Sequence, residues 1–386
     1  MIKKLVFALL LFTSLNGQAQ ENLNFNRNKE IASPEINADK SLTFRLMAPN
    51  VKKVELQGDL LGKNDPVAMT KQDDGLWSYT TSPLKSELYS YSFIVDGLKI
   101  RDANNVYQIR DVASVVNVVI VPGGKADNYL VKDVPHGTVS KRWYKSPGNE
   151  KDRRISIYTP PGYENDKKKY PVLYLLHGMG GDEEAWLALG RTAQILDNLI
   201  ADGKVTPMIV VMPNGNVAQA AAPGEDSKGL YKPGMQLPNT MDGKMEETFP
   251  DIIKFIEGNY RAKADPAHRA IAGLSMGGFH SLHISRFYPK TFDYVGLFSP
   301  AIMPFAKTTS PVYENFDVTL KNQFNNGLKL YWIGIGKTDF LYKSVADYRK
   351  KLDETGAKYT YSESEGGHTW SNWRDYLVLF TPQLFK

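Results

Sequence analysis

The sequence of 386 residues contains no cysteine. The chain therefore forms no disulfide, offers no thiol nucleophile and no cysteine-ligated zinc site, and lacks the cysteine that carries the lipid of a bacterial lipoprotein. Histidine is scarce, with six residues in all, so any histidine base comes from a short list. Beyond the N-terminal segment, no apolar run is long enough to span a membrane.

The chain also lacks a strong excess of either charge. Lysine and arginine total 47 against 42 aspartates and glutamates, which gives a formal net charge of +5. Lys3 and Lys4 account for two of these charges and belong to a segment that we expect to be removed. The remainder is small for this length, so nothing favours nucleic acid or a membrane surface as a partner.

The N-terminus has the pattern of an export signal. Met1–Lys4 is basic, residues 5–15 are apolar, and Gly17 and Ala19 are small residues before a cleavage point. We predict that residues 1–19 are a signal peptide and that the protein is exported to the bacterial periplasm or beyond. The apolar stretch is too short for a membrane anchor. Residues 20–38 are polar and predict a flexible arm.

Residues 39–122 contain short segments of alternating apolar and polar residues separated by turn residues. Asp96-Gly97 is typical of a tight hairpin turn between two such strands. Short strands at regular spacing predict an immunoglobulin-like β-sandwich. Residues 123–130 follow as a linker. From residue 131 to 386, apolar strands alternate with helical patterns, which predicts an α/β domain with a mostly parallel sheet covered by helices on both faces.

The most informative motif is Gly-x-Ser-x-Gly at Gly273–Gly277, which follows an apolar strand and precedes a helical pattern. A strand, a sharp turn and a helix form a nucleophile elbow, in which the serine is held in a strained conformation and its hydroxyl is exposed. An ordinary tight turn is the alternative. The context favours Ser275 as a nucleophile.

A serine nucleophile needs a base and an acid that orients the base. In hydrolases with a nucleophile elbow these residues follow in the order serine, acid, histidine. Asp339 follows a strand predicted at residues 328–336, and His368 follows one at residues 358–363. Both therefore belong to the same edge of the sheet as Ser275. Glu363 and Glu365 are alternatives to Asp339, but sequence adjacency to the histidine argues little, and the strand-end position favours Asp339.

The remaining histidines suggest no second site. His280 and His283 form an HxxH pair, which lacks the glutamate of a metalloprotease motif, so we interpret them as helix-surface or core residues. His136 and His268 lie in polar loops. The chemistry predicted for Ser275 needs no metal and no organic cofactor.

A glycine-rich loop at residues 177–182 follows the strand predicted at residues 170–176. Such a loop allows backbone N–H groups to converge on a developing oxyanion. In hydrolases of this kind the other donor is the residue after the nucleophile. We therefore expect the N–H groups of Met179 and Met276 to form the oxyanion hole, while the side chain of His177 packs.

Residues 214–244 show no clear periodicity and are rich in proline and glycine. Long connections of this kind are usually functional, and this one follows a strand end near Ser275. A surface excursion that only packs is equally compatible with the pattern. Four side chains of this loop could line an aromatic acyl pocket: Tyr231, Met235, Leu237 and Met241.

Four motifs over residues 131–386 together resemble carbohydrate esterase family 1, which contains feruloyl and acetylxylan esterases and also mycolyltransferases and S-formylglutathione hydrolases. They are Leu176–Gly181, Gly273–Gly278, Gly336–Asp339 and Gly367–Trp370. The resemblance implies an α/β-hydrolase fold with Ser275, Asp339 and His368 as the catalytic triad. It does not fix the acyl group.

The N-terminal strands are similar to family 48 carbohydrate-binding modules, whose members often bind α-glucans. The segments that carry the similarity are Phe44–Pro49, Asp74–Trp77 and Tyr91–Gly97. Trp77, Tyr89 and Tyr91 could stack on sugar rings, although we expect them to fill the core or the interdomain contact. The module could instead wall the active site.

These observations lead to the hypothesis of a secreted serine esterase that removes feruloyl groups from plant cell-wall arabinoxylan or its acylated oligosaccharides through an acyl-enzyme. The alternative within the same family is an acetylxylan esterase. More remote alternatives are an acyltransferase and a glycan-binding protein without activity.

Overall fold

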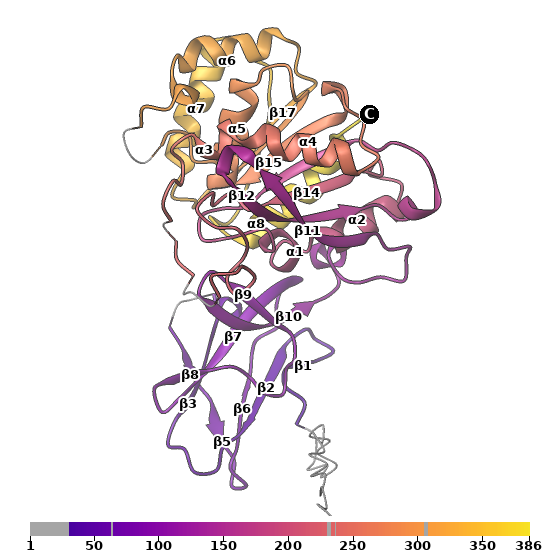
Figure 1. Ribbon diagram of the computed structural model, residues 1–386. Helices are drawn as coiled ribbons and strands as arrows, with labels where there is room; N and C mark the ends of the chain where they lie inside the picture. The colour runs from indigo at the N-terminus through magenta and orange to yellow at the C-terminus, as the bar shows by residue number, and fades with distance from the viewer. Residues whose placement is uncertain (1–30, 63–64, 230–232, 236, 305–307) are drawn as a thin grey trace, which may run out of the picture.

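The computed structural model describes residues 31–62, 65–229, 233–235, 237–304 and 308–386. The strands β1 to β10 form one unit, and the chain from β11 onward forms a second, larger unit (Figure 1). The predicted signal peptide and residues 20–30 of the predicted arm lie outside the described residues. Across the described ranges, no helix has the length and apolar character needed to cross a membrane.

The first unit consists of two antiparallel sheets with the strand orders β1-β2-β6-β5 and β4-β3-β7-β10-β9, and β8 pairs with β7. Inward side chains such as Phe44, Leu56 and Phe93 form its core. The strands are β1 Glu35–Ile36, β2 Leu42–Met47, β3 Val54–Gly58, β4 Val67–Ala68, β5 Thr70–Lys71, β6 Leu76–Thr80, β7 Glu87–Val95, β8 Leu98–Ile100, β9 Gln108–Asp111 and β10 Ser114–Val121.

The turn between β7 and β8 shows how the sequence specifies this unit. Asp96 and Gly97 have φ values of 46° and 89°, as the two central residues of a type I′ hairpin turn require. The structure thus confirms the tight turn predicted there. Strand β9 has no such signature, because Gln-Ile-Arg-Asp neither alternates clearly nor is rich in β-branched residues.

The second unit is built on an eight-stranded sheet with the order β11-β12-β14-β13-β15-β16-β17-β18. The pairs β11–β12 and β12–β14 are antiparallel, and the other pairs are parallel. The central strands are buried on both faces, which explains their continuous apolar sequences. The strands are β11 Thr138–Ser146, β12 Lys151–Thr159, β13 Val172–Leu176, β14 Ile209–Pro213, β15 Arg269–Leu274, β16 Tyr294–Phe298, β17 Leu330–Gly336 and β18 Thr360–Ser364.

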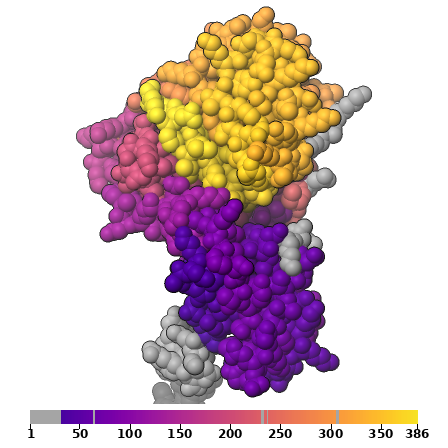
Figure 2. Space-filling model, turned by 180° about the vertical axis from the view of Figure 1, so that it is seen from behind, coloured from indigo at the N-terminus to yellow at the C-terminus, as the bar shows by residue number. Residues whose placement is uncertain are grey.

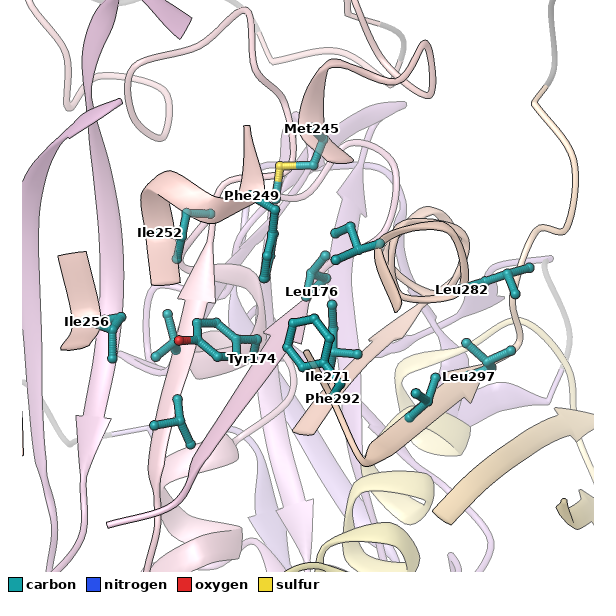
Figure 3. Close-up of a cluster of buried hydrophobic side chains, with 14 of the residues drawn as sticks. Tyr174, Leu176, Met245, Phe249, Ile252, Ile256, Ile271, Leu282, Phe292 and Leu297 are labelled. Atoms are coloured by element: carbon teal, nitrogen blue, oxygen red, sulfur yellow. The ribbon is translucent and has the colours of Figure 1, made fainter. Parts of the chain in front are cut away.

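Helices cover both faces of this sheet, as expected for an α/β-hydrolase-type fold. Side chains of α3 to α7 pack on one face, where Phe249 and Ile252 of α4 meet Tyr174 of β13 (Figure 3). Side chains of α1, α2 and α8 pack on the other face. The helices are α1 Ala185–Ala188, α2 Thr192–Ala201, α3 Lys244–Glu247, α4 Phe249–Asn259, α5 Met276–Phe287, α6 Phe316–Asn325, α7 Tyr342–Glu354 and α8 Trp370–Phe380.

The two units are in direct contact (Figure 2). Residues 123–130, predicted as a linker, contain the 3₁₀ turn Lys125–Asn128 and bury Ala126 and Tyr129 in the core on the α2 and α8 side. Glu87 of β7 lies at the centre of the contact. Arg374 of α8 donates to its carboxylate at 2.9 Å, and Lys125 Nζ lies 2.6 Å from it.

Glu87 also accepts hydrogen bonds from the hydroxyls of Tyr129 and Ser371. Burial alone would raise the pKa of Glu87. The charge of Arg374 and the hydrogen bonds outweigh burial and lower the pKa to about 2. The ionised carboxylate is therefore a structural element of the contact between the units.

We predict that Glu87→Gln lowers the free energy of unfolding at pH 7 by about 3 kcal/mol, because it leaves Arg374 buried without its partner charge. The pKa of Glu87 is depressed on folding, so its contribution is present above the unfolded pKa and is lost as pH falls toward about 2. Urea denaturation at several pH values measures the difference. Glu35→Gln, in an exposed ion pair with Arg45, is the control and should cost less than about 1 kcal/mol. Equal effects of the two variants would contradict the role assigned to Glu87.

Candidate active site

Ser275 occupies the turn between β15 and α5. Its φ of 53° and ψ of −113° are a strained conformation for a residue with a side chain. The turn is held tightly, because the Ser275 N–H donates to the carbonyl oxygen of Phe298 at 2.9 Å. A β-carbon on Gly277 would lie 2.3 Å from the carbonyl oxygen of Leu176. Only glycine therefore allows the first turn of α5 to approach β13 this closely.

His368 and Asp339 lie together on the loops that follow β18 and β17. His368 Nδ1 is 2.9 Å from Oδ2 and 3.1 Å from Oδ1 of Asp339. The Leu341 N–H donates to Oδ1 at 2.8 Å. Burial opposes ionisation of Asp339, but the hydrogen bonds from His368 and Leu341 outweigh it and lower the pKa of the carboxyl. The carboxylate is thus held in its charged form against the imidazole.

The two other acids near His368 have different partners. Glu363 accepts hydrogen bonds from the hydroxyls of Tyr342 and Tyr361. Glu365 pairs with Lys337 at 2.5 Å. Among the described residues, Asp339 is therefore the carboxylate that orients His368.

Ser275 and His368 line the same cavity. Within the described part of the chain, no hydrogen bond joins the Ser275 hydroxyl to His368, and in free enzymes such bonds are often long until substrate binds. The His368 ring lies between Phe340 and Trp373, with ring centroids 4.5 Å and 4.9 Å away. With Nδ1 donating to Asp339, Nε2 is left as an acceptor that can take a proton from a hydroxyl.

Met179 and Met276 both line this cavity. Across the described ranges, neither backbone N–H has a hydrogen-bond partner. Met276 is the first residue of α5, where N–H groups are free and the helix dipole favours negative charge. The Met276 side chain is buried with Phe279, and Met179 packs against the same cluster.

His177 lies behind this loop and is fully buried. Its Nε2 accepts the Gly215 N–H at 2.7 Å, and its Nδ1 lies 2.7 Å from the Gly178 carbonyl oxygen. Burial lowers the pKa of His177 to about 4, so the ring is neutral at physiological pH. The expectation that this side chain packs is confirmed, and the structure adds that it links the glycine-rich loop to the loop after β14.

His280 and His283 are buried on α5, which matches the core alternative given for them. His280 Nδ1 lies 2.7 Å from Glu246 Oε1. His283 Nε2 donates to the carbonyl oxygen of Ile302 at 3.0 Å. Burial lowers the pKa of His283 to about 3.

The four candidates of the long loop have different positions. Met235 lines the cavity and is half exposed. Met241 is buried against Met276 and Phe279. The carbonyl oxygen of Leu237 accepts a hydrogen bond from Thr240, and Leu237 is not among the cavity residues of the described chain. Tyr231 lies outside the described residues.

The cavity has a volume of about 940 Å³, and both units line it. Strands β7, β9 and β10 provide the part of the cavity wall that belongs to the first unit. Of the three aromatic residues singled out in the first unit, Trp77 and Tyr91 are buried in its core, and Tyr89 is half buried and lines the cavity. Sequence patterns missed Arg110 and Val112 on this wall, because only the packing of the two units brings them near Ser275.

Three consecutive acids end the glycine-rich loop, and each contacts a different segment. Asp182 pairs with Arg110 of β9 at 2.5 Å. Glu183 accepts the Ala222 N–H of the long loop at 2.9 Å. Glu184 pairs with Lys141 of β11 at 2.5 Å. Two ion pairs and one hydrogen bond therefore connect this end of the loop to β9, β11 and the long loop.

Residues 146–383 match the family named Esterase, described as "Putative esterase". The match extends over more than half of the chain. The chain belongs to the esterase family. It is a carboxylic ester hydrolase.

Relatives of this esterase support the assignment. The chain is 29% identical to an endo-1,4-beta-xylanase/feruloyl esterase of Xylanibacter ruminicola, over 92% of this chain and 46% of that protein. The chain thus spans less than half the length of that relative. A solved ferulic acid esterase is 26% identical with a TM-score of 0.52 and covers 64% of this chain and 97% of its own.

The enterobactin esterase of Shigella flexneri is 15% identical with a TM-score of 0.62, over 89% of this chain and 92% of that chain. At this identity the likeness shows a shared fold alone. Because it covers most of this chain, the likeness extends beyond the eight-stranded sheet.

The buried carboxyl of Glu183 makes the stability of the esterase depend on pH. Burial raises the pKa of Glu183 to about 7, although the Ala222 N–H and Arg154 favour the ionised form. An acid whose pKa rises on folding binds more protons in the folded state, so stability falls as pH rises from about 4.5 to about 7.

We predict that Glu183→Gln removes this part of the pH dependence. The difference in unfolding free energy between variant and wild type should change by up to about 3 kcal/mol across that window. Urea denaturation of both proteins between pH 4.5 and pH 8 tests this, with the exposed Glu35→Gln as control. Identical pH profiles for Glu183→Gln and wild type would refute it.

Proposed function

We propose that this esterase is a secreted serine esterase that hydrolyses feruloyl or related hydroxycinnamoyl esters of plant cell-wall xylan. Ser275, His368 and Asp339 form its catalytic triad. One observation carries the proposal: a strained elbow serine shares a cavity with a histidine that is hydrogen-bonded to a buried carboxylate.

The roles follow from the geometry. His368 Nε2 removes the proton of Ser275 as its oxygen attacks the ester carbonyl. Asp339 holds the imidazole tautomer through Nδ1 and stabilises the imidazolium that forms. The N–H groups of Met179 and Met276 hydrogen-bond to the oxyanion. As the bond between the carbonyl carbon and the sugar oxygen breaks, the protonated His368 gives its proton to that oxygen, and an acyl-enzyme remains. Water activated by His368 then releases the acid.

The aromatic acyl group is supported by two observations. The Xylanibacter relative is named a feruloyl esterase, and the solved structure is named a ferulic acid esterase. The cavity of about 940 Å³ is large, and Met179, Met235, Phe340 and Trp370 give it apolar and aromatic walls. Acetyl groups on xylan are the alternative, and a small ester distinguishes the two.

The first unit completes this proposal. We interpret its two antiparallel sheets as an immunoglobulin-like sandwich similar to family 48 carbohydrate-binding modules, which walls the cavity opposite Ser275. Residues 1–19 direct export to the periplasm or the medium. The partner is acylated polysaccharide or oligosaccharide.

The first test compares hydrolysis of methyl ferulate, 4-nitrophenyl acetate and acetylated xylan by wild type and Ser275→Ala. We expect methyl ferulate to be cleaved well and the variant to lose several orders of magnitude in rate. If only acetyl esters are hydrolysed, the role of Ser275 stands and the proposed feruloyl specificity is wrong. Transfer of the acyl group to an added sugar would favour an acyltransferase. Retained polysaccharide binding without turnover of any ester would favour a glycan-binding protein.

The second test concerns the acid. Asp339→Asn should lower kcat by about 10⁴-fold, because the amide favours the wrong imidazole tautomer. Glu363→Gln is the matched control, since its carboxylate contacts tyrosine hydroxyls rather than His368. A large loss in Glu363→Gln with little change in Asp339→Asn would reverse the assignment.

A further inference from the structure

The β9–β10 hairpin of the first unit reaches the glycine-rich loop of the second. In Figure 1, β9 and β10 lie at the end of the first unit that faces α1. Arg110 of β9 makes a 2.5 Å ion pair with Asp182, whose side chain is only 3% exposed, while Arg110 itself is 28% exposed. A buried carboxylate of this kind depends on its partner charge. The hairpin therefore provides the charge that this end of the loop requires.

The tip of the hairpin makes a second contact. Val112 has a φ of 50°, which is unusual for a β-branched residue and indicates that the surrounding structure imposes it. A β-carbon on Gly180 would lie 2.8 Å from Val112 Cγ2 and 2.7 Å from Met235 Sδ. The side chain of Val112 thus lies directly on the backbone of the loop.

Residues 178–181 form a tight turn that contains Gly180 and is followed directly by Asp182. The Gly181 N–H donates to the carbonyl oxygen of Gly178 at 3.1 Å, and Gly180 has a φ of 76°. A positive φ at the third position is typical of a type II turn. Met179 is the second residue of this turn. The turn sets the direction of the Met179 N–H. Asp182 holds the end of the turn, and Val112 packs on its third residue, Gly180.

We propose that Arg110 and Val112 are positioning residues for the oxyanion hole. They act through Asp182 and Gly180 to hold the Met179 N–H in place, so the first unit completes the catalytic machinery of the second. The inference rests on the proposed function, in which Met179 is an oxyanion donor. It holds for any acyl group, because every ester passes through the same oxyanion.

The effect should appear in the rate of the chemical step. Removing one oxyanion donor costs about 10²- to 10³-fold in kcat, and loosening a donor should cost less. Arg110→Met should therefore lower kcat for 4-nitrophenyl acetate about 10- to 100-fold with little change in KM. The small acetyl ester distinguishes this role from direct substrate binding by Arg110. If Arg110 bound the substrate directly, Arg110→Met would raise KM for large esters and leave the acetyl ester unaffected.

The matched control is Arg45→Met. Arg45 also belongs to the first unit, is 27% exposed and pairs with Glu35 at 2.7 Å, but lies on the other sheet. Arg110→Lys keeps the charge and should recover part of kcat. Val112→Gly removes the contact on Gly180 without breaking the ion pair, so it tests the same role if Arg110→Met folds poorly. Thermal unfolding of each variant separates loss of fold from loss of rate.

The reaction of Ser275 with diethyl 4-nitrophenyl phosphate gives a second readout. The serine oxygen bonds to phosphorus, 4-nitrophenolate leaves, and the proposed oxyanion hole would bind the phosphoryl oxygen. We expect the rate constant to fall in Arg110→Met and Val112→Gly, by a factor close to the loss of kcat, and to be unchanged in Arg45→Met. Wild-type rates in folded Arg110→Met and Val112→Gly would overturn the inference while the proposed function stands. A wild-type enzyme inert to every ester and to the phosphate would overturn the proposed function, and this inference with it.

Discussion

The close approach of α5 to the end of β13 is the constraint on which the site depends. Gly277 lies so near the Leu176 carbonyl that no β-carbon fits between them. This contact places the first turn of α5, with the free Met276 N–H, beside the loop that carries Met179. It also forces the chain to reverse at Ser275, where the strained φ turns the side chain toward the cavity. Geometry at one glycine thus brings together the proposed nucleophile and both proposed oxyanion donors.

Charge, rather than apolar packing alone, fixes the loops around this centre. Glu87 connects β7 to Arg374 of α8 and holds the two units together. Asp182 connects the glycine-rich loop to Arg110 of β9, and Glu183 connects it to the base of the long loop. Burying these carboxylates is costly unless each has a partner. The glycine-rich loop and the first unit are therefore held in a fixed relation.

Local sequence patterns predict much of the candidate site. The turn between an apolar strand and a helix predicts Ser275 as the nucleophile. The strand-end position favours Asp339 over Glu363, and in the structure Asp339 lies within hydrogen-bond distance of His368. The alternation of strands and helices also predicts the mostly parallel sheet with helices on both faces, whereas the antiparallel pairing of β11, β12 and β14 was not predicted. These features are encoded over a few residues, so periodicity and turn chemistry reveal them.

Features that depend on distant segments were not visible in the sequence. Arg110 and Asp182 are 72 residues apart, and β9 has no alternating pattern. Met241 looks like a cavity residue by its loop and chemistry, yet it is buried against Met276. Such placements are decided by how the two units and the long loop pack. No local pattern records that packing.

The same packing bears on how the first unit contributes to substrate recognition. A glycan-binding module usually presents aromatic faces to solvent, but Trp77 and Tyr91 are buried in the core of this unit. Tyr89 lines the cavity, and its hydroxyl donates to the Lys85 carbonyl. The surface that this unit offers to an ester is therefore the part of the cavity wall formed by β7, β9 and β10. An ester that reaches Ser275 would contact both units, because residues of both units line the cavity.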